Sequence, residues 1–228
     1  MQDPVFVQRA FSRIADRYVL TNHVLSMGTD VLWRKKVARM VAGRKPERLL
    51  DLATGSGDLA AEIAKKCPDT EIIGADFCQP MLKYARQRGL ADLIVADALQ
   101  LPFGGGTFDV VTVAFGLRNM ADWPAAVSEM RRVLKPGGVL VILDFSLPKG
   151  ILGAPYGFYL NQVLPRVAGL LTGQRDAYEY LSKSVGAFPS GENMESLLKE
   201  CGFGKATSEA LSFGIASVYA GEHPASDS

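Results

Sequence analysis

The sequence has few of the residues that build disulfide frameworks and metal sites. Its three cysteines, Cys67, Cys78 and Cys201, form no Cys-x-x-Cys pair, and there are only two histidines. This argues against a structural zinc site and favours a reducing compartment. No window approaches the roughly 20 uninterrupted apolar residues that a membrane-spanning helix needs. The charged N-terminal stretch lacks the apolar core of a signal peptide. We therefore expect a soluble, cytoplasmic protein without a bound metal.

The sequence also has no excess of charge of either sign. It contains 25 basic and 24 acidic residues, for a formal net charge of +1. This balance gives no electrostatic reason to expect a nucleic acid as the main partner. With 228 residues, 48% of them hydrophobic, the chain fits one large domain that buries a substantial core.

Apolar strands alternate with amphipathic helices through the middle of the chain. Strands are predicted at 48–53, 71–77, 92–98, 108–116 and 137–146, with helices ending near 66 and 88 and another over 123–134. This alternation indicates a doubly wound α/β sheet. Residues 205–222 read as two short strands joined through Gly214. We expect a Rossmann-like, seven-stranded sheet whose last strand is antiparallel.

A glycine turn separates the first predicted strand from the first helix. In "LLDLATGSGDLA", Gly55, Ser56 and Gly57 let the backbone approach a ligand at a helix N-terminus, where N–H groups are free. Asp76 ends the second strand, where a carboxylate can meet ribose hydroxyls. The pattern Gly55-x-Gly57-x-x-Ala60 with Asp76 also fits a dinucleotide fingerprint. These residues alone leave NAD(P) and S-adenosylmethionine as comparable ligands.

Three further features favour S-adenosylmethionine. Asp51 precedes the glycines, where it suits an ammonium group and would repel a pyrophosphate. Asp97 and Ala98 end the third strand, where they can read an adenine edge. No second mononucleotide-binding half follows, and the motif order is that of class I methyltransferases. The predicted cofactor-binding residues are Asp51, Gly55, Ser56, Gly57, Asp76, Phe77, Met81, Asp97, Ala98 and Ala114. For a single strand-end aspartate, a helix cap is an equally good explanation, and core packing is one for Met81.

Several stretches resemble a particular methyltransferase family. "AFGLRNMAD" (114–122), "RVLKPGGVLVILDFS" (132–146), the arm "YVLTNHVLSMGTDVLWRK" (18–35) and the late stretch 158–185 are similar to the ubiquinone/menaquinone biosynthesis C-methyltransferases. The resemblance covers roughly residues 6–222. The chain departs from the family at Val19, Thr21, Asp30 and Asp144, where Asp, Met, His and Glu are usual. These positions bear on which quinone is accepted.

The resemblance implies methylation of a ring carbon of a prenylated hydroquinone, with demethylmenaquinol as the leading acceptor. It implies substrate contacts from Tyr18, Asn22, His23 and Trp33. Arg118 and Asn119 follow the fourth strand, and we expect them to act in catalysis, with Asp58 holding the Arg118 guanidinium. The alternative is a purely structural pair between Arg118 and Asp58 or Asp122. His23 is equally well explained as an interfacial histidine. The resemblance also allows peripheral membrane contact and a homodimer.

Four segments follow from these assignments. Residues 1–45 form an N-terminal helical arm or lid, and 46–146 form the cofactor-binding core. Residues 147–190 form an apolar insertion on the acceptor side, and 191–222 provide the final helix and hairpin of the same domain. Other functions remain open: a methyltransferase for another aromatic or sterol-like molecule, a catalytically silent cofactor-binding subunit of a quinone-synthesis complex, and, more remotely, a nicotinamide enzyme.

Overall fold

The computed structural model describes residues 26, 28–148, 150, 153–159, 162 and 182–225. The strands are β1 (Arg48–Leu52), β2 (Glu71–Asp76), β3 (Asp92–Val95), β4 (Phe108–Ala114), β5 (Leu134–Phe145), β6 (Lys205–Leu211) and β7 (Ala216–Glu222). The helices are α2 (Asp30–Ala42), α3 (Asp58–Ala64), α4 (Gln79–Gln87), α5 (Trp123–Val133), α6 (Gly153–Phe158) and α9 (Glu192–Glu200), with short 3-10 turns η1 (Leu117–Asn119) and η4 (Ser212–Gly214).

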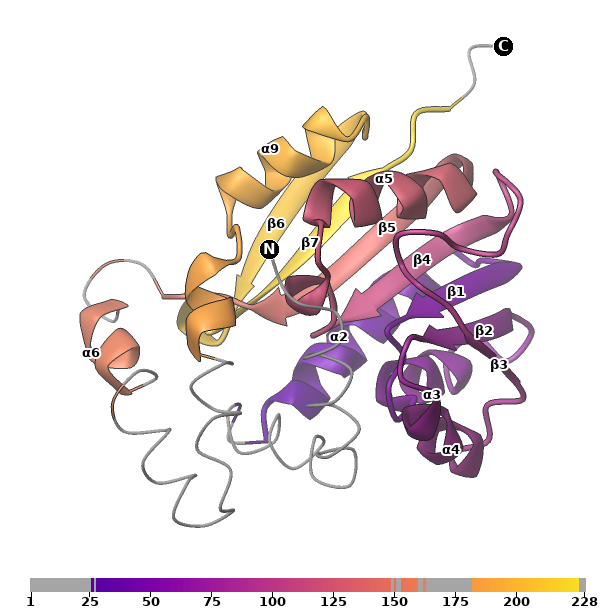
Figure 1. Cartoon of the computed structure of the whole chain (residues 1–228), viewed down its shortest axis with the longest axis horizontal. Coiled ribbons are helices and arrows are strands. Elements are labelled where there is room, and N and C mark those ends of the chain that lie inside the picture. The colour runs from indigo at the N-terminus through magenta and orange to yellow at the C-terminus, as the bar shows by residue number, and fades with distance from the viewer. Residues whose placement is uncertain are drawn as a thin grey trace.

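The described strands form one seven-stranded sheet with the order β3-β2-β1-β4-β5-β7-β6 (Figure 1). Strands β1 to β5 run parallel to one another, whereas β7 runs antiparallel to both β5 and β6. The predicted antiparallel last strand is therefore confirmed. The chain starts at β1, steps outward to β3, and returns to β4 on the other side of β1. This reversal between β1 and β4 creates the crevice where α/β sheets bind ligands.

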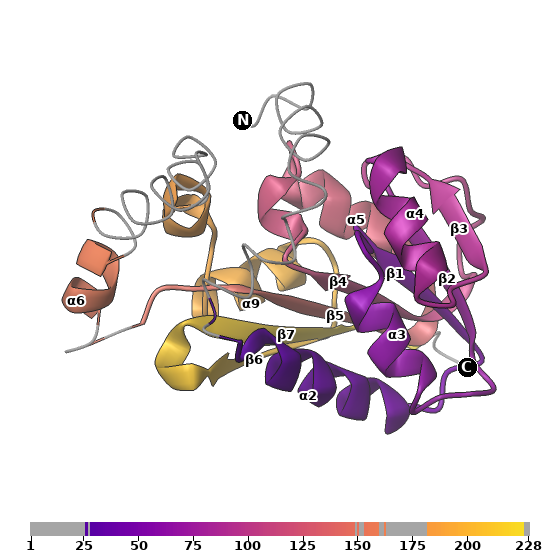
Figure 2. The same ribbon diagram turned by 90° about the horizontal axis from the view of Figure 1, so that it is seen from below.

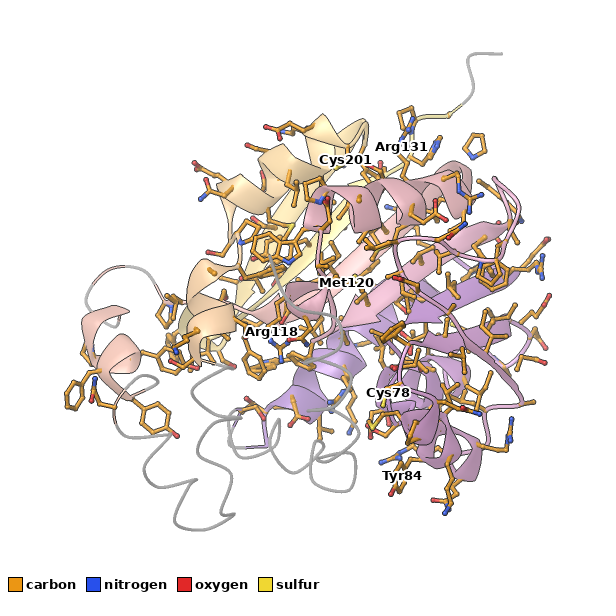
Figure 3. All side chains as sticks on the ribbon, in the orientation of Figure 1. Cys78, Tyr84, Arg118, Met120, Arg131 and Cys201 are labelled. Atoms are coloured by element: carbon orange, nitrogen blue, oxygen red, sulfur yellow. The ribbon has the colours of Figure 1, made fainter. Side chains whose placement is uncertain are left out.

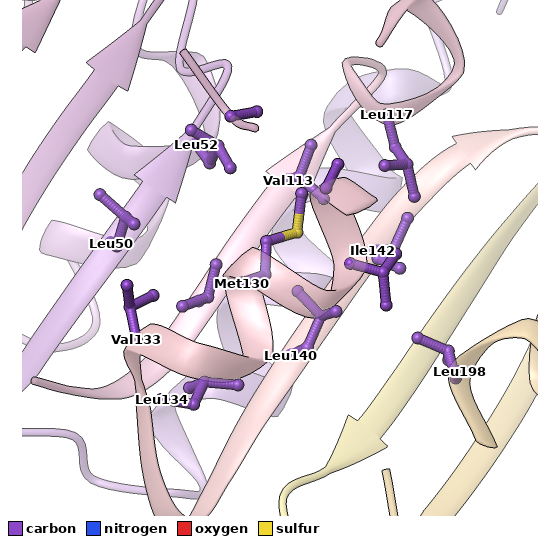
Figure 4. Close-up of a cluster of buried hydrophobic side chains, with 14 of the residues drawn as sticks. Leu50, Leu52, Val113, Leu117, Met130, Val133, Leu134, Leu140, Ile142 and Leu198 are labelled. Carbon is purple, nitrogen blue, oxygen red and sulfur yellow. The ribbon is translucent and has the colours of Figure 1, made fainter. Parts of the chain in front are cut away.

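Helices cover both faces of the sheet. Helices α2 and α3 pack on one face, and α5 and α9 pack on the other (Figure 2). Strand residues alternate between the two cores: Leu49 faces the first, and Leu50 and Leu52 face the second. In the second core, Met130 of α5 lies among side chains of β1, β4 and β5 (Figure 4). Burial on both faces explains why these strands read as continuous apolar runs.

The part of the predicted N-terminal arm that the structure describes is a core helix. Trp33 of α2 is 4% exposed, and its ring packs edge-on against Phe145 and at a tilt against Phe115. Its indole N–H donates a hydrogen bond of 2.9 Å to the Ser212 hydroxyl in η4. Trp33 therefore ties α2 to the ends of β4 and β5 and to the turn between β6 and β7.

The strand and helix bounds differ from the prediction by a few residues. Strand β5 begins at Leu134 rather than at 137, because its first residues already pair with Phe108 across a register shift. The connection between β3 and β4 is not helical over residues 96–107. No helix among the described residues is long and apolar enough to cross a membrane. The division of the chain into four segments stays a prediction.

We expect Trp33→Ala to lower the free energy of unfolding by about 3–5 kcal/mol, because it removes a buried aromatic side chain and leaves a cavity. Leu32→Ala is the matched control: this neighbouring residue is 62% exposed, and its loss should cost less than about 0.5 kcal/mol. Urea denaturation followed by circular dichroism measures both. Equal effects of the two substitutions would contradict the core role of Trp33.

Candidate functional site

Two adjoining cavities lie at the carboxyl ends of β1, β2 and β4. The first, here called the Asp76 cavity, is lined by residues that include Asp76, Phe77, Cys78, Met81, Asp97, Ala98, Gly116, Asn119 and Met120. The second, the Asp51 cavity, is lined by residues that include Arg34, Asp51, Thr54, Ser56, Asp58 and Ala114. The cavities share Ala53, Gly55 and Phe115. Together they form one groove along the edge of the sheet, at the reversal point.

The shared part of the groove contains strained backbone. Ala53 and Phe115 both adopt positive φ values, 51° and 57°, although neither is a glycine. A Cβ atom on Gly116 would lie 2.5 Å from the Ala53 Cβ atom, so only glycine fits at that position. Left-handed non-glycine residues cost free energy and cluster at functional sites. The strained residues Ala53 and Phe115 thus stand where the two cavities meet, at the ends of β1 and β4.

Asp76 is placed to bind hydroxyl groups. Its carboxylate accepts hydrogen bonds from the backbone N–H groups of Gly55 at 2.8 Å and Cys78 at 2.7 Å. These bonds fix the side chain at the end of β2. Burial raises its pKa, and the two N–H groups oppose that rise. A fixed carboxylate at this strand end suits the two hydroxyls of a ribose.

The far end of the Asp76 cavity has the surfaces that an adenine ring needs. Phe77 is 42% exposed, whereas Met81 and Ala98 are buried, and all three line the cavity. Asp97 is exposed and also lines the cavity. Its carboxylate accepts a hydrogen bond of 2.9 Å from the Leu99 N–H, so it also serves the turn. The structure brings together the residues predicted for the nucleoside.

Asp51 supplies the negative charge of the second cavity. The side chain is 1% exposed, and it accepts hydrogen bonds of 2.6 Å from both the Thr54 and the Thr112 hydroxyls. Burial raises the pKa of Asp51 to about 6, against the opposing effect of these hydroxyls. The charge of Asp76 raises this pKa further, whereas that of Arg34 lowers it. A bound ammonium group would stabilise the ionised form and complete the site.

The glycine loop differs in part from the expectation. Gly55 lines both cavities, as predicted for a residue that approaches a ligand. Gly57 has a φ of 79°, but a Cβ atom there would lie 2.6 Å from the Leu90 side chain and 3.1 Å from the Ala85 backbone. Its side of the loop therefore faces α4, and packing between α3 and α4 requires the glycine. Arg88 reinforces this packing by donating to the Ser56 carbonyl at 3.0 Å.

Asp58 does not hold the Arg118 guanidinium, and that expectation is wrong. Asp58 pairs with Arg88 at 3.1 Å. Arg118 pairs with Asp144 of β5 at 2.6 Å, and neither of the alternatives, Asp58 and Asp122, is its partner. Asp122 instead caps α5 by accepting from the Ala125 N–H at 2.9 Å.

Arg118 is buried behind the wall of the groove. It is 1% exposed, and its Nη1 also donates to the Phe115 carbonyl at 2.6 Å. Its guanidinium lies 5.4 Å from the centre of the Phe145 ring. Figure 3 shows Arg118 beyond the end of β4, with Met120 beside it and Cys78 across the strand ends. Asn119 lines the Asp76 cavity and donates to the Phe115 carbonyl at 3.2 Å.

The predicted substrate residues are only partly placed. Trp33 is buried in the core, next to the groove residue Phe115. Tyr18, Asn22 and His23 lie outside the described residues. Their substrate role stays a prediction, as does the catalytic role of Arg118 and Asn119.

Sequence reasoning missed Arg34, which lines the Asp51 cavity, Thr112, which donates to Asp51, and Asp144, the partner of Arg118. Arg34 carried a usable signal, because it stands four residues after Asp30 in the stripe of α2 that faces the core. A basic residue in an apolar stripe indicates a buried partner or a ligand. Thr112 lies inside a buried strand and gives no such signal. Asp144 stands where the family usually has Glu, and this departure alone does not indicate its partner.

The fold matches those of solved methyltransferases. A SAM-dependent methyltransferase of Thermotoga maritima, described as a possible histamine N-methyltransferase, superposes with a TM-score of 0.68 at 20% identity, covering 93% of this chain and 98% of that one. A phosphoethanolamine N-methyltransferase of Haemonchus contortus, solved with S-adenosylmethionine, gives 0.58 at 19% identity, covering 78% and 49%. The fold is therefore that of the class I, S-adenosylmethionine-dependent methyltransferases.

The sequence comparisons narrow this class. The model of the ubiE/COQ5 methyltransferase family matches residues 2–223. The demethylmenaquinone methyltransferase of Thermus thermophilus is 46% identical over 94% of this chain and 100% of its own length. That of Deinococcus radiodurans is 45% identical over 95% and 92%, and a ubiquinone/menaquinone biosynthesis C-methyltransferase of Bdellovibrio bacteriovorus is 41% identical over 96% of both chains. The chain belongs to the ubiE/COQ5 methyltransferase family.

The groove fits the cofactor of this class. Its two cavities offer apolar surface and Asp97 for an adenine, Asp76 for a ribose, and Asp51 for an ammonium group. Within the described residues, no group of three or more metal-ligating side chains comes together.

We expect Asp51→Asn to weaken the binding of S-adenosylhomocysteine about 10- to 100-fold at pH 7.5, because hydrogen bonds to charged groups contribute about 1.5–3 kcal/mol. The pKa of Asp51, about 6, makes wild-type affinity constant above pH 7 and lower below pH 6, where the carboxyl is protonated. The variant should lose this pH dependence. Isothermal titration calorimetry from pH 5 to 8 measures both effects.

The exposed Asp69→Asn serves as the charge-matched control. The pH affects the stability of the ligand-free protein in the opposite sense to its ligand affinity. Because the pKa of Asp51 in the folded protein exceeds the unfolded value of about 3.9, its ionisation lowers the free energy of unfolding as the pH rises from about 4 to about 6. Asp51→Asn should therefore stabilise the ligand-free protein at pH 7.5 but not at pH 4. An unchanged affinity in Asp51→Asn would contradict the assignment of this carboxylate.

Proposed function

We propose that this chain methylates a ring carbon of a prenylated hydroquinone, with demethylmenaquinol as the acceptor and menaquinol as the product. The observation that carries the proposal is the near full-length match to demethylmenaquinone methyltransferases at 45–46% identity. Ubiquinone precursors are the second acceptor class, since relatives at 37–41% identity are named for both quinones.

The residues of the groove fit this chemistry. When bound, S-adenosylmethionine supplies an electrophilic methyl group on a sulfonium that is already a good leaving group. The sulfonium joins the nucleoside to the amino acid, so it would lie near Ala53, Gly55 and Phe115, the residues that the two cavities share. The acceptor carbon would have to be held beside these residues. A ring carbon becomes nucleophilic when an adjacent phenol loses its proton, so the quinol is the competent acceptor. The protein has to align the ring, exclude water and favour the phenolate.

Arg118 and Asn119 are proposed to act on the acceptor. They follow the end of β4, and Asn119 lines the groove. The positive charge of Arg118 lies behind the groove wall at Phe115 and lowers the cost of a phenolate there. Asp144 fixes the guanidinium, which is the role first expected of Asp58. Asp58 itself is proposed to serve the Asp51 cavity, which it lines.

We also propose peripheral contact with the membrane that holds the prenylated acceptor. Large apolar side chains are exposed at Leu147 after β5, at Phe158 in α6 and at Phe213 in η4, the last with 85% exposure. Such residues can bury in the headgroup region of a bilayer. A homodimer remains a prediction from the family alone.

Methyl transfer from labelled S-adenosylmethionine to demethylmenaquinol in detergent tests the proposed reaction, with oxidised demethylmenaquinone as the control. We expect product from the quinol only, because the oxidised ring has no phenol to ionise. Turnover of soluble phenols but not of prenylated quinols would indicate another aromatic acceptor. Cofactor binding without turnover of any acceptor would indicate a silent subunit. Either outcome contradicts the proposal.

Paired substitutions separate a catalytic Arg118 from a structural one. Arg118→Met alone should destabilise the fold by about 3–5 kcal/mol, because it leaves the buried Asp144 carboxylate without its partner. Arg118→Met with Asp144→Asn removes both charges and should fold. We expect this double variant to bind S-adenosylhomocysteine within about threefold of wild type yet to lose about 10²–10³ in kcat.

The readouts are melting temperature, calorimetric affinity and single-turnover rate. Arg48→Met with Glu71→Gln is the control, since it removes an exposed ion pair at the opposite ends of β1 and β2. Near-normal turnover by the folded double variant would make the pair structural only.

A further inference from the structure

Arg34 is a buried basic residue that the reaction described above does not use. It stands on α2 and is 6% exposed, yet it lines the Asp51 cavity. The neighbouring buried positions on this face of α2 include Val37, Ala38 and Val41. A guanidinium is always charged, so its burial among apolar residues requires compensation from a partner or a ligand.

The protein holds this guanidinium in place from two sides. Nη1 donates to the Asp30 carboxylate at 2.5 Å, and the Ser26 hydroxyl donates to the other Asp30 oxygen at 2.8 Å. On the other side, the guanidinium lies 5.5 Å from the centre of the Phe115 ring, at the end of β4. Within the described part of the chain, the hydrogen bond to Asp30 is the one that Arg34 makes. The remaining N–H groups of the planar fork are thus left for a bidentate partner.

The charges around the cavity define what that partner must be. Among the described residues that line the Asp51 cavity, Arg34 is the one basic residue, and two carboxylates line it as well. Asp58 is already paired with Arg88. This leaves Asp51 and Arg34, whose charges interact, as one negative and one positive charge that line the same cavity. Such a pair is complementary to a zwitterion, with an ammonium at Asp51 and a carboxylate at Arg34.

We propose that Arg34 binds the α-carboxylate of the methionine part of S-adenosylmethionine, and that Asp30 and Ser26 are its positioning residues. Asp30 then has a role that the departure from the usual histidine did not suggest: it orients the carboxylate-binding fork. The inference concerns the cofactor and is independent of the acceptor, so its test involves no quinol.

Calorimetric binding of two ligands tests the proposal. S-Adenosylhomocysteine carries the carboxylate, and its decarboxylated analogue, S-adenosyl-3-thiopropylamine, lacks it. We expect Arg34→Gln to weaken S-adenosylhomocysteine binding about 30- to 100-fold, as for the loss of a charge-assisted bidentate pair. Binding of the decarboxylated analogue should change by less than about threefold. Arg34→Lys keeps the charge but not the fork, and should give an intermediate loss for the carboxylate ligand only.

Two controls keep the result unambiguous. Lys35→Gln removes a positive charge from the adjacent, exposed position of α2 and should affect neither ligand. If Arg34→Gln fails to fold, because Asp30 is left buried without this partner, the double variant Asp30→Asn with Arg34→Gln removes both charges and should show the same selective loss.

Equal losses for both ligands, or no loss for either, would overturn the proposal. A failure of quinol methylation would leave this ligand comparison unaffected.

Discussion

The ion pair between Arg118 and Asp144 is the constraint on which the groove wall depends. Both side chains are buried, and together with the Phe115 carbonyl they tie the turn after β4 to the end of β5. Separating two such charges in the interior is costly, so the turn has one favoured position. That position places Phe115, Gly116 and Asn119 along the groove.

The other side of the groove depends on close backbone packing. Gly57 and Gly116 each occupy a place where a Cβ atom would collide, the first with α4 and the second with Ala53. Ala53 and Phe115 accept left-handed backbone to end β1 and β4 in the same place. Strain at these residues is balanced by the two cores beneath them, which keeps the strand ends fixed relative to each other. A rigid groove of this kind binds a ligand without a large ordering cost.

The sheet could be predicted because strands buried on both faces leave a direct trace in the sequence. The aspartates at the ends of β1, β2 and β3 could be placed for the same reason, since parallel strands end at one edge. The partner of Arg118 could not be predicted, because it depends on the register in which Ala114 lies opposite Leu143. Arg34 reaches the cavity only through the packing of α2 on the sheet, which no local pattern encodes.

A crystal structure with S-adenosylhomocysteine tests the central claim most directly. The account predicts that the adenosine lies in the Asp76 cavity and the amino acid in the Asp51 cavity, with the sulfur at the shared residues Ala53, Gly55 and Phe115. The sulfur lone pair that carries the methyl group in S-adenosylmethionine should then face Asn119. A ligand bound in the reverse direction, or a sulfur directed away from Asn119, would contradict it.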